Sequence, residues 1–593
     1  MMYAGKQGRG RNDGSDRAKN KGYVLKRLWN YLYYYRRKLF VAILFTIVSN
    51  VLSLVGPYLT GQTISAMENG VDFNRVFLFA GLMIVFYLLS ASMNYILSVQ
   101  MTKISQSVTY KMRKDLFEKL NHVSISYFDQ NQTGDIISRM SYDIDTINTS
   151  LANDVISTFT SLITVTISLV MMIIMSPILV LVFVVTLPIS ILITRVLSKI
   201  VKKKYRYRNQ KLGELNGFSE EMITGQRTIQ SYVQEESVLK KFDDINEEAS
   251  KASYEAGYYS TSVGPSVNFV SNLSVALVGV FGGILYFLSR ISIGDLTSFT
   301  LYSRRFSGPI NQFSNIMADI QSALAAAERV FNVIDHENEP ADKPNAIEAV
   351  DVKGEVTFDH VSFGYLQYQI VLKDVSFKAK QGQVIAIVGP TGAGKTTLVN
   401  LLMRFYDVND GSIYLDHHET RDITRKSLRR AFSMVLQDTW IFHGTVHDNI
   451  AYGNGDVSRL EVEEAAKKAR IHSFISHLPE GYDTILTDEG MNISKGQKQL
   501  LVIARAMLSK TKMLILDEAT SNVDTHTEVQ IQKAMLALME HKTTFVIAHR
   551  LSTIQNADMI LVVKDGDIVE KGNHQELIEH QGFYYELYQS QFA

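Results

Sequence analysis

Long uncharged stretches fill the first part of the chain, and short apolar stretches separated by polar ones fill the rest. Six stretches are long enough to cross about 30 Å of hydrocarbon as helices. They span residues 39–59, 76–99, 154–175, 177–197, 264–289 and 296–320. Ser176-Pro177 separates the third stretch from the fourth and predicts a tight turn at one membrane face. The pattern therefore predicts a membrane domain of six transmembrane helices within residues 23–335.

Basic residues are distributed unevenly among the connections between these stretches. Segments 100–152 and 198–262 carry many Lys and Arg residues, whereas the other connections hold one Arg at most. Basic connections remain on the cytoplasmic side, so both segments and both chain termini are expected in the cytoplasm. Both segments are long and amphipathic, which predicts helices that extend beyond the membrane. Residues 23–38 combine aromatic and basic side chains and predict an interfacial elbow helix.

The composition changes after residue 335. Residues 336–353 hold prolines and acidic groups and predict a linker, and residues 354–593 alternate short apolar strands with helical patterns. The fold class expected is a membrane α-helical domain followed by a soluble α/β domain. Residues 1–22 predict a disordered basic tail rather than a nucleic-acid arm. Lys plus Arg equals Asp plus Glu at 60 each, so net charge indicates no partner, and the absence of cysteine excludes disulfides and thiolate chemistry.

A phosphate-binding loop, or P-loop, follows the strand predicted at Val384–Val388. The segment reads Gly-Pro-Thr-Gly-Ala-Gly-Lys-Thr and matches G-x-x-x-x-G-K-[ST] between a predicted strand and a predicted helix. Its glycines let backbone N–H groups approach phosphate oxygens at the start of a helix. Lys395 is expected to pair with the β- and γ-phosphates, and Thr396 to bind Mg²⁺. The ATP-binding residues predicted here are Gly389, Pro390, Thr391, Gly392, Ala393, Gly394, Lys395, Thr396 and Thr397.

A second apolar strand ends in two carboxylates, Asp517 and Glu518. Two carboxylates in a turn are usually solvated, but behind a phosphate-binding loop they indicate ATP hydrolysis. Asp517 at the strand end is expected in the Mg²⁺ shell, and Glu518 is expected to polarise the attacking water.

Further segments occur in an order that resembles the ATP-binding-cassette exporters, in which membrane and nucleotide-binding domains are fused. The resemblance covers nearly the whole chain after the tail. It implies the membrane fold of type I ABC exporters, which is also called the type IV fold. It implies that Tyr365 stacks on adenine, that Gln437 contacts Mg²⁺ or water, and that His549 contacts the γ-phosphate. It also places Asp524 in the D-loop. The residues implied to couple the two domains are Phe128, Asp129, Gly134, Asp135 and Glu489, and a second coupling helix is expected near residues 213–228.

The signature segment departs from the family pattern. Ser494, Lys495, Gly496 and Gln497 stand where most members have Ser-Gly-Gly-Gln, and in the family this segment closes on ATP held by the other chain. Lys495 adds a long side chain where backbone should approach phosphate, and it lacks the φ freedom of glycine. The resemblance therefore implies a heterodimer with a second half-transporter chain.

In that heterodimer, Lys395, Asp517, Glu518 and His549 form a competent ATP site with the partner's unaltered signature. The altered signature faces the partner's P-loop at a degenerate site, and the partner is expected to lack the catalytic glutamate. A homodimer that tolerates Lys495 is the alternative, since symmetric assemblies are the commoner case.

The sixth apolar stretch contains polar residues that bear on the cargo. An Arg at the centre of a membrane helix costs about 2.5–3.5 kcal/mol, so such residues line a wet cavity, pair between helices or reach the interface. The candidates are Arg304, Arg305, Asn311 and Gln312. The resemblance implies ATP-driven export of small hydrophobic or amphipathic compounds, of multidrug type, across a bacterial cytoplasmic membrane. Lipid flipping is one alternative, and peptide export without a cysteine protease domain is another. The six spans exclude a soluble regulator of ribosomes or DNA.

Overall fold

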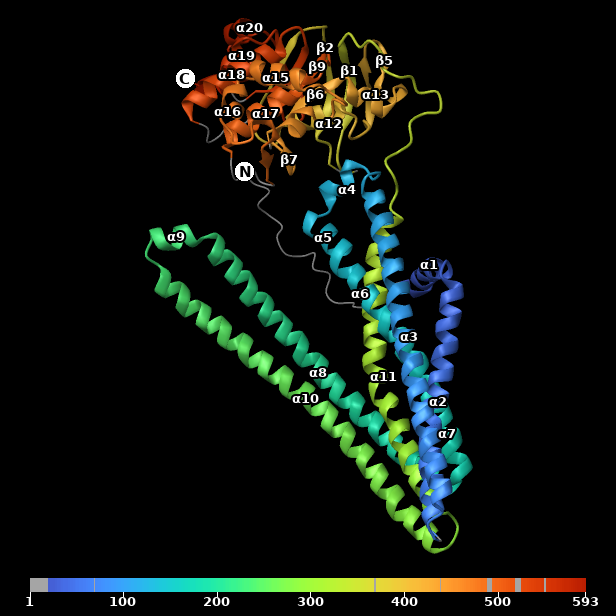
Figure 1. The fold of residues 1–593 in the computed structure, drawn as a ribbon. Coiled ribbons are helices and arrows are strands. Elements are labelled where there is room, and N and C mark those ends of the chain that lie inside the picture. The colour runs from blue at the N-terminus through green and yellow to red at the C-terminus, as the bar shows by residue number, and fades with distance from the viewer. Residues whose placement is uncertain are drawn as a thin grey trace. The chain divides into compact units, whose positions relative to one another are not determined.

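The computed structural model describes residues 20–68, 70–366, 369–437, 439–487, 493–517, 524–548 and 551–592. The chain forms two compact units (Figure 1). The first contains the chain up to Asn121 together with Thr133–His336, and the second contains His122–Gln132 together with the chain from Glu337 onward. Residues 122–132, which fall within the predicted membrane domain, therefore pack with the second unit.

The first unit consists of helices, most of them long. The long helices are α2 Arg36–Glu68, α3 Phe73–Leu120, α7 Val155–Met175, α8 Pro177–Thr224, α10 Glu235–Phe287 and α11 Ile293–Ile334. The short ones are α1 Lys21–Tyr33, α5 Thr133–Ser138, α6 Ile144–Thr149 and α9 Gln226–Ser231, with π-helical turns at Arg139–Asp143 and Ser150–Asp154. Helix α8 packs along α10, α2 along α3, and α11 against α2 and α7.

Five helical stretches of the described chain are long and apolar enough to cross a membrane. They are α2, α3, Thr133–Met175, α8 and α10, and they hold the first five predicted spans apart from the last two residues of 264–289. Extended backbone at Ser176 ends α7, and Pro177 begins α8, as the Ser-Pro pair predicts. Helix α11 holds the sixth predicted span but is too polar to meet the same test, so that span stays a prediction.

The predicted elbow helix 23–38 is two elements in the structure. Helix α1 ends at Tyr33 and α2 begins at Arg36, so the last basic residues of the stretch belong to α2. Tyr31 on α1 donates a hydrogen bond of 2.7 Å to Asp115 on α3. The inner face of α1 therefore packs on its neighbouring helices, and only its outer face is left for an interface.

The second unit is an α/β domain with two main sheets. A six-stranded sheet has the order β12-β11-β3-β10-β9-β6, and a four-stranded antiparallel sheet has the order β2-β1-β4-β5. Strands β11, β3, β10, β9 and β6 run parallel, and β12 pairs antiparallel at one edge. The strands of these sheets are β1 Val356–Phe363, β2 Leu372–Ala379, β3 Val384–Val388, β4 Asp410–Leu415, β5 His418–Glu419, β6 Phe432–Val435, β9 Met513–Asp517, β10 Thr543–Ile547, β11 Met559–Lys564 and β12 Asp567–Gly572.

Helices and a small ribbon complete this unit. Strands β7 Gly444–Thr445 and β8 Ile485–Leu486 pair with each other. The helices are α4 Ile125–Gln130, α12 Lys395–Leu402, α13 Arg425–Arg430, α14 Val446–Ala451, α15 Arg459–Lys468, α16 His472–Ser476, α17 Lys495–Leu508, α18 Thr525–Met539, α19 Leu551–Gln555, α20 His574–His580 and α21 Phe583–Phe592.

Successive side chains of a strand point to opposite faces of the sheet. Each face of the parallel strands is covered by an apolar cluster, so both faces are buried. Ala386 and Val388 of β3 join one apolar cluster, which includes residues of α15, α17 and α18. Ile385 and Ile387 join the other, which includes α12 and strands β1, β2 and β4. This double burial explains why the strands read as continuous apolar runs. It also leaves the strand ends as the places where polar side chains gather.

The predicted linker 336–353 is fastened to the second unit. Arg425, buried on α13, donates to the carbonyl of Pro340 at 2.7 Å and to Asp342 at 2.8 Å. The same guanidinium donates to Asp407 at 2.9 Å. Ile347 forms a parallel bridge with Ile423. A buried Arg held by two carboxylates fixes this segment in place, so residues 337–353 are an ordered part of the second unit.

Candidate functional site

The predicted nucleotide-binding segments leave the same edge of the six-stranded sheet. Gly389 directly follows β3, Gln437 follows β6, and Asp517 is the last residue of β9. These strands are parallel, so the structure brings the segments together at their carboxyl ends. Ligands of open α/β sheets bind at this edge. His549 follows the parallel strand β10 by two residues in the sequence but lies outside the described residues.

Three glycines give the P-loop its path. Gly389, Gly392 and Gly394 have φ values of +155°, +86° and +108°, which side chains rarely adopt. A Cβ at Gly389 would lie 2.1 Å from the carbonyl oxygen of Val563, and one at Gly394 would lie 2.8 Å from Leu372 Cδ2. Gly394 also caps α12. The loop therefore requires glycine at its first and last turns, as the motif predicts.

The amine of Lys395 points back into this loop. Its Nζ donates to the carbonyl oxygens of Gly389 at 2.7 Å and Pro390 at 3.0 Å. Burial lowers the pKa of Lys395, and the nearby negative charge of Asp517 opposes that shift. A cation in this position, beside the amides of a loop that begins a helix, has the charge and the placement to meet phosphate oxygens.

Substitution of Gly389 tests the loop. We expect Gly389→Ala to weaken ATP binding by about tenfold or more, because the added Cβ meets backbone and the loop must distort. Titration of the full chain with a fluorescent ATP analogue measures this. Gly382→Ala is the matched control: Gly382 also has a positive φ, of +74°, but a Cβ there meets nothing within 4 Å. Equal affinities for the two variants would contradict the assignment.

Tyr365 lies beside the P-loop helix. The residue is 41% exposed, and its hydroxyl lies 3.1 Å from Thr397 Oγ1 and 3.2 Å from Asn400 Nδ2, both on α12. A partly exposed aromatic residue next to the P-loop fits the adenine-stacking role expected of it. Thr397, predicted as an ATP-binding residue, is buried and faces this tyrosine.

Oxygen donors suited to a metal ion gather at the same sheet edge. The side chains of Thr396 and Gln437 are exposed, and Asp517 closes strand β9. Hydroxyl, amide and carboxylate oxygens are the donors that Mg²⁺ prefers, so this set fits the predicted magnesium role. The catalytic candidate Glu518 and the coupling candidate Glu489 lie outside the described residues.

The signature residues begin helix α17. Ser494 is the N-cap: its Oγ accepts from the backbone N–H of Gln497 at 3.2 Å, and Gln497 Oε1 accepts from Ser494 N–H at 2.8 Å. Lys495 is exposed in the first helical position, and Gly496 is buried. The expectation that Lys495 lacks a needed φ freedom is wrong, because a helical position accepts any L-residue. The bulk and charge of its side chain are the remaining differences from glycine.

The D-loop residue Asp524 has a structural task of its own. It is the N-cap of α18, and its Oδ2 accepts from the backbone N–H of Thr527 at 2.8 Å. Hydrogen bonds from Thr527 hold the pKa of Asp524 below its usual value, so the capping carboxylate stays ionised.

The polar residues of α11 do not form one group. Arg305 donates from Nη1 to Ser53 Oγ on α2 at 2.9 Å, which is the interhelical contact considered as an alternative. Arg304 and Gln312 are exposed, and the side chain of Asn311 lies outside the described residues. Their expected role at a substrate cavity stays a prediction.

The predicted coupling residues lie on two short helices. Phe128 and Asp129 are on α4, and Gly134 and Asp135 are on α5. Asp129 accepts a hydrogen bond from Tyr406 of the same unit. Sequence reasoning missed Tyr406 because an aromatic residue after an apolar helix has the pattern of ordinary core packing. Residues 213–228, where a second coupling helix is expected, lie mostly in α8, and the short helix α9 covers the end of that range.

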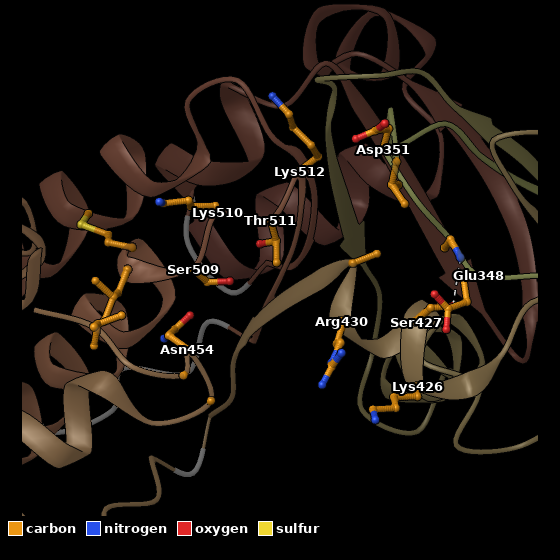
Figure 2. Close-up of a pocket in the computed structure, with 18 of the residues that line it drawn as sticks. Glu348, Asp351, Lys426, Ser427, Arg430, Asn454, Ser509, Lys510, Thr511 and Lys512 are labelled. Atoms are coloured by element: carbon orange, nitrogen blue, oxygen red, sulfur yellow. Dashed lines mark hydrogen bonds between the residues drawn. The ribbon is translucent and has the colours of Figure 1, made fainter.

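A wide cavity of about 1660 Å³ lies in the second unit, and Figure 2 shows residues that line it. Its lining includes Arg430, which precedes β6, and Lys510 and Lys512, which precede β9. It is therefore at the amino ends of the parallel strands, opposite the edge that carries the P-loop. The lining holds basic and acidic side chains in equal number, six of each, so its charge favours no ligand class.

Known proteins share this sequence and fold. Residues 39–310 match the family described as ABC transporter transmembrane region, and residues 372–521 match the ABC transporter family. An uncharacterized ABC transporter ATP-binding protein of Bacillus subtilis is 40% identical over 97% of this chain and 95% of its own. A fatty acid ABC transporter ATP-binding/permease protein of Mycobacterium tuberculosis is 40% identical over 87% and 82%.

Two further comparisons agree with these. An ATP-dependent lipid A-core flippase of Syntrophus aciditrophicus is 34% identical over 86% of this chain and 84% of its own. The solved structure of a bacterial Atm1-family ABC exporter with ATP bound superposes with a TM-score of 0.75, at 29% identity, and covers 94% of this chain and 98% of that one. With the P-loop geometry and the helical first unit, these matches show that the chain belongs to the ABC exporters, as a half-transporter whose ATPase activity is coupled to transport across a membrane.

Proposed function

We propose that this chain is the catalytic half of a heterodimeric exporter with one competent and one degenerate ATP site. The observation that carries the proposal is Lys495, an exposed cation in the first turn of α17. A helix N-terminus binds phosphate through free N–H groups and positive potential. A lysine at this point holds a long side chain between those groups and an approaching nucleotide, and it adds charge where a helix favours anions.

At the competent site, this chain supplies the P-loop and the partner supplies an unaltered signature. Lys395 and the loop amides meet the phosphate charge, Tyr365 stacks on adenine, and Glu518 places the water that attacks the γ-phosphorus as ADP leaves. Gln437 and His549 contact the water and the γ-phosphate. The donors on Thr396, Gln437 and Asp517 fit Mg²⁺, which supplies positive charge to the phosphates when bound.

At the degenerate site, Ser494, Lys495, Gly496 and Gln497 face the P-loop of the partner. ATP bound there turns over slowly. Closure of the nucleotide domains on ATP moves the coupling helices and turns the membrane cavity outward, and hydrolysis reverses the change, since the nucleotide states favour different conformations.

The cargo we propose is an amphipathic compound with an acyl-like apolar part. The printed names of two relatives, a fatty acid transporter and a lipid A-core flippase, favour lipid-type molecules within the hydrophobic and amphipathic class. Export runs across the cytoplasmic membrane, with both termini and the nucleotide domain in the cytoplasm, because the basic connections are on that side.

The test is the ATPase activity of this chain in nanodiscs, alone and co-purified with the half-transporter encoded beside it. We expect little activity alone and a rise of about tenfold or more with the partner, further stimulated by fatty acids. Strong activity of the chain alone, unchanged by the partner, would refute the heterodimer. Stimulation by cationic dyes and not by fatty acids would refute the lipid-type cargo.

A further inference from the structure

Tyr406 belongs to a cluster of three aromatic rings. Its ring is edge-on to Tyr365, with centroids 5.0 Å apart and planes at 87°. Phe363 is edge-on to Tyr365 at 5.0 Å and tilted toward Tyr406 at 5.6 Å. Edge-to-face packing at these distances is favourable and depends on orientation. A change in the position of Tyr365 therefore changes the packing of Tyr406.

The hydroxyl of Tyr406 donates a hydrogen bond to Asp129 Oδ2 on α4. Burial raises the pKa of Tyr406, and the hydrogen bond to Asp129 and its charge raise that pKa further. The phenol therefore stays protonated at neutral pH and remains a donor to the carboxylate. Hydrogen bonds to charged groups are stronger than those between neutral groups.

The other end of the chain of contacts is the P-loop helix. Tyr365 is held by Thr397 and Asn400 of α12, the helix that begins with Lys395. Contacts thus run from α12 through Tyr365 and Tyr406 to Asp129. All of these residues belong to one compact unit, and α4 connects in sequence to α3 on one side and α5 on the other.

We propose that Tyr406 is a positioning residue that passes the state of the adenine side of the ATP site to the first coupling helix. Stacking of adenine on Tyr365 orients the Tyr406 ring, and the Tyr406 hydroxyl orients Asp129 and with it α4. The inference rests on the proposed roles of Tyr365 and Asp129, and it adds a direct route that bypasses Gln437 and the signature segment.

If the Tyr406 ring only filled space, its substitution would have a different effect from the one that the proposed relay predicts. A ring that only fills space is replaced well by phenylalanine, because Tyr406→Phe keeps the edge-on contacts and removes only the hydroxyl. A relay through the hydroxyl fails in that variant. Asp129→Asn keeps an oxygen that accepts from Tyr406 and should preserve the relay, whereas Asp129→Ala should abolish it.

The experiment uses the co-purified heterodimer in nanodiscs and proteoliposomes. Wild type, Tyr406→Phe, Asp129→Asn, Asp129→Ala and the double variant with Tyr406→Phe and Asp129→Ala are compared for KM for ATP, kcat, substrate stimulation, transport per ATP and Tm. Tyr414→Phe is the control, since Tyr414 pairs in β4 and is partly buried like Tyr406.

We expect Tyr406→Phe to leave KM and Tm near wild type and to lower transport per ATP about tenfold. Asp129→Ala should match it, the double variant should be no worse than either, and Asp129→Asn should stay near wild type. Wild-type coupling in Tyr406→Phe, or additive losses in the double variant, would overturn the relay. A wild-type complex without substrate-stimulated hydrolysis would instead refute the proposed function.

Discussion

Lys495→Gly is expected to raise the ATPase activity of the chain purified alone by about tenfold or more. In a pair of identical chains, each ATP lies between a complete P-loop and an altered signature. Removal of the Lys495 side chain clears the N-terminus of α17, where the residue is exposed and its backbone is already helical. Because no backbone change is needed, the glycine variant restores the phosphate-binding end without refolding it. Phosphate release by the isolated chain in nanodiscs measures the gain.

The heterodimer gives the sharper comparison. There the Lys495→Gly change should alter turnover by less than about twofold, since in the proposed heterodimer the partner's site is also expected to lack its catalytic glutamate and to stay slow. Lys498→Ala, one turn along α17, is the control for loss of a positive charge, and Lys495→Ala separates side-chain length from the absence of a Cβ. A chain that hydrolyses ATP rapidly alone and gains nothing from Lys495→Gly would establish the homodimer.

Features carried by contiguous residues could be predicted from the sequence. The P-loop depends on a strand, three glycines and a helix within one short segment, and the structure has all of them, with the positive φ values that the glycines permit. The break at Ser176 also follows from local chemistry, because proline is favoured at the first position of a helix, which Pro177 occupies in α8. In such cases local sequence and tertiary structure require the same conformation.

Features that depend on distant pairs could not be predicted. Tyr406 and Asp129 are separated by 277 positions, and neither residue type indicates the other. Arg305 reads equally as a cavity residue or as a helix contact, and only the position of Ser53 on α2 shows that it makes a contact between helices. Sequence order alone places segment 122–132 within the predicted membrane domain. In the structure the contacts of this segment place it in the second unit.

Glu518→Gln is expected to lower ATP hydrolysis by the heterodimer by about a hundredfold or more while ATP binding is retained. Glutamine keeps the size and one oxygen of the side chain but cannot polarise water as a carboxylate does. Asp517→Asn should behave differently, because Asp517 ends strand β9 and is expected in the Mg²⁺ shell. That variant should lose the magnesium dependence of nucleotide affinity. Phosphate release and retention of labelled ATP, measured on the same preparations, separate the two roles.

The size of the residual activity in Glu518→Gln decides between one working site and two. If the partner's site is degenerate, no fast site remains, and transport stops together with hydrolysis. If the partner contributes a competent site of its own, about half of the turnover survives, because the two sites then act in parallel. A half-active complex would therefore contradict the asymmetric assignment while leaving Glu518 as the catalytic group of its own site. Full activity would remove Glu518 from catalysis and require another group to place the water.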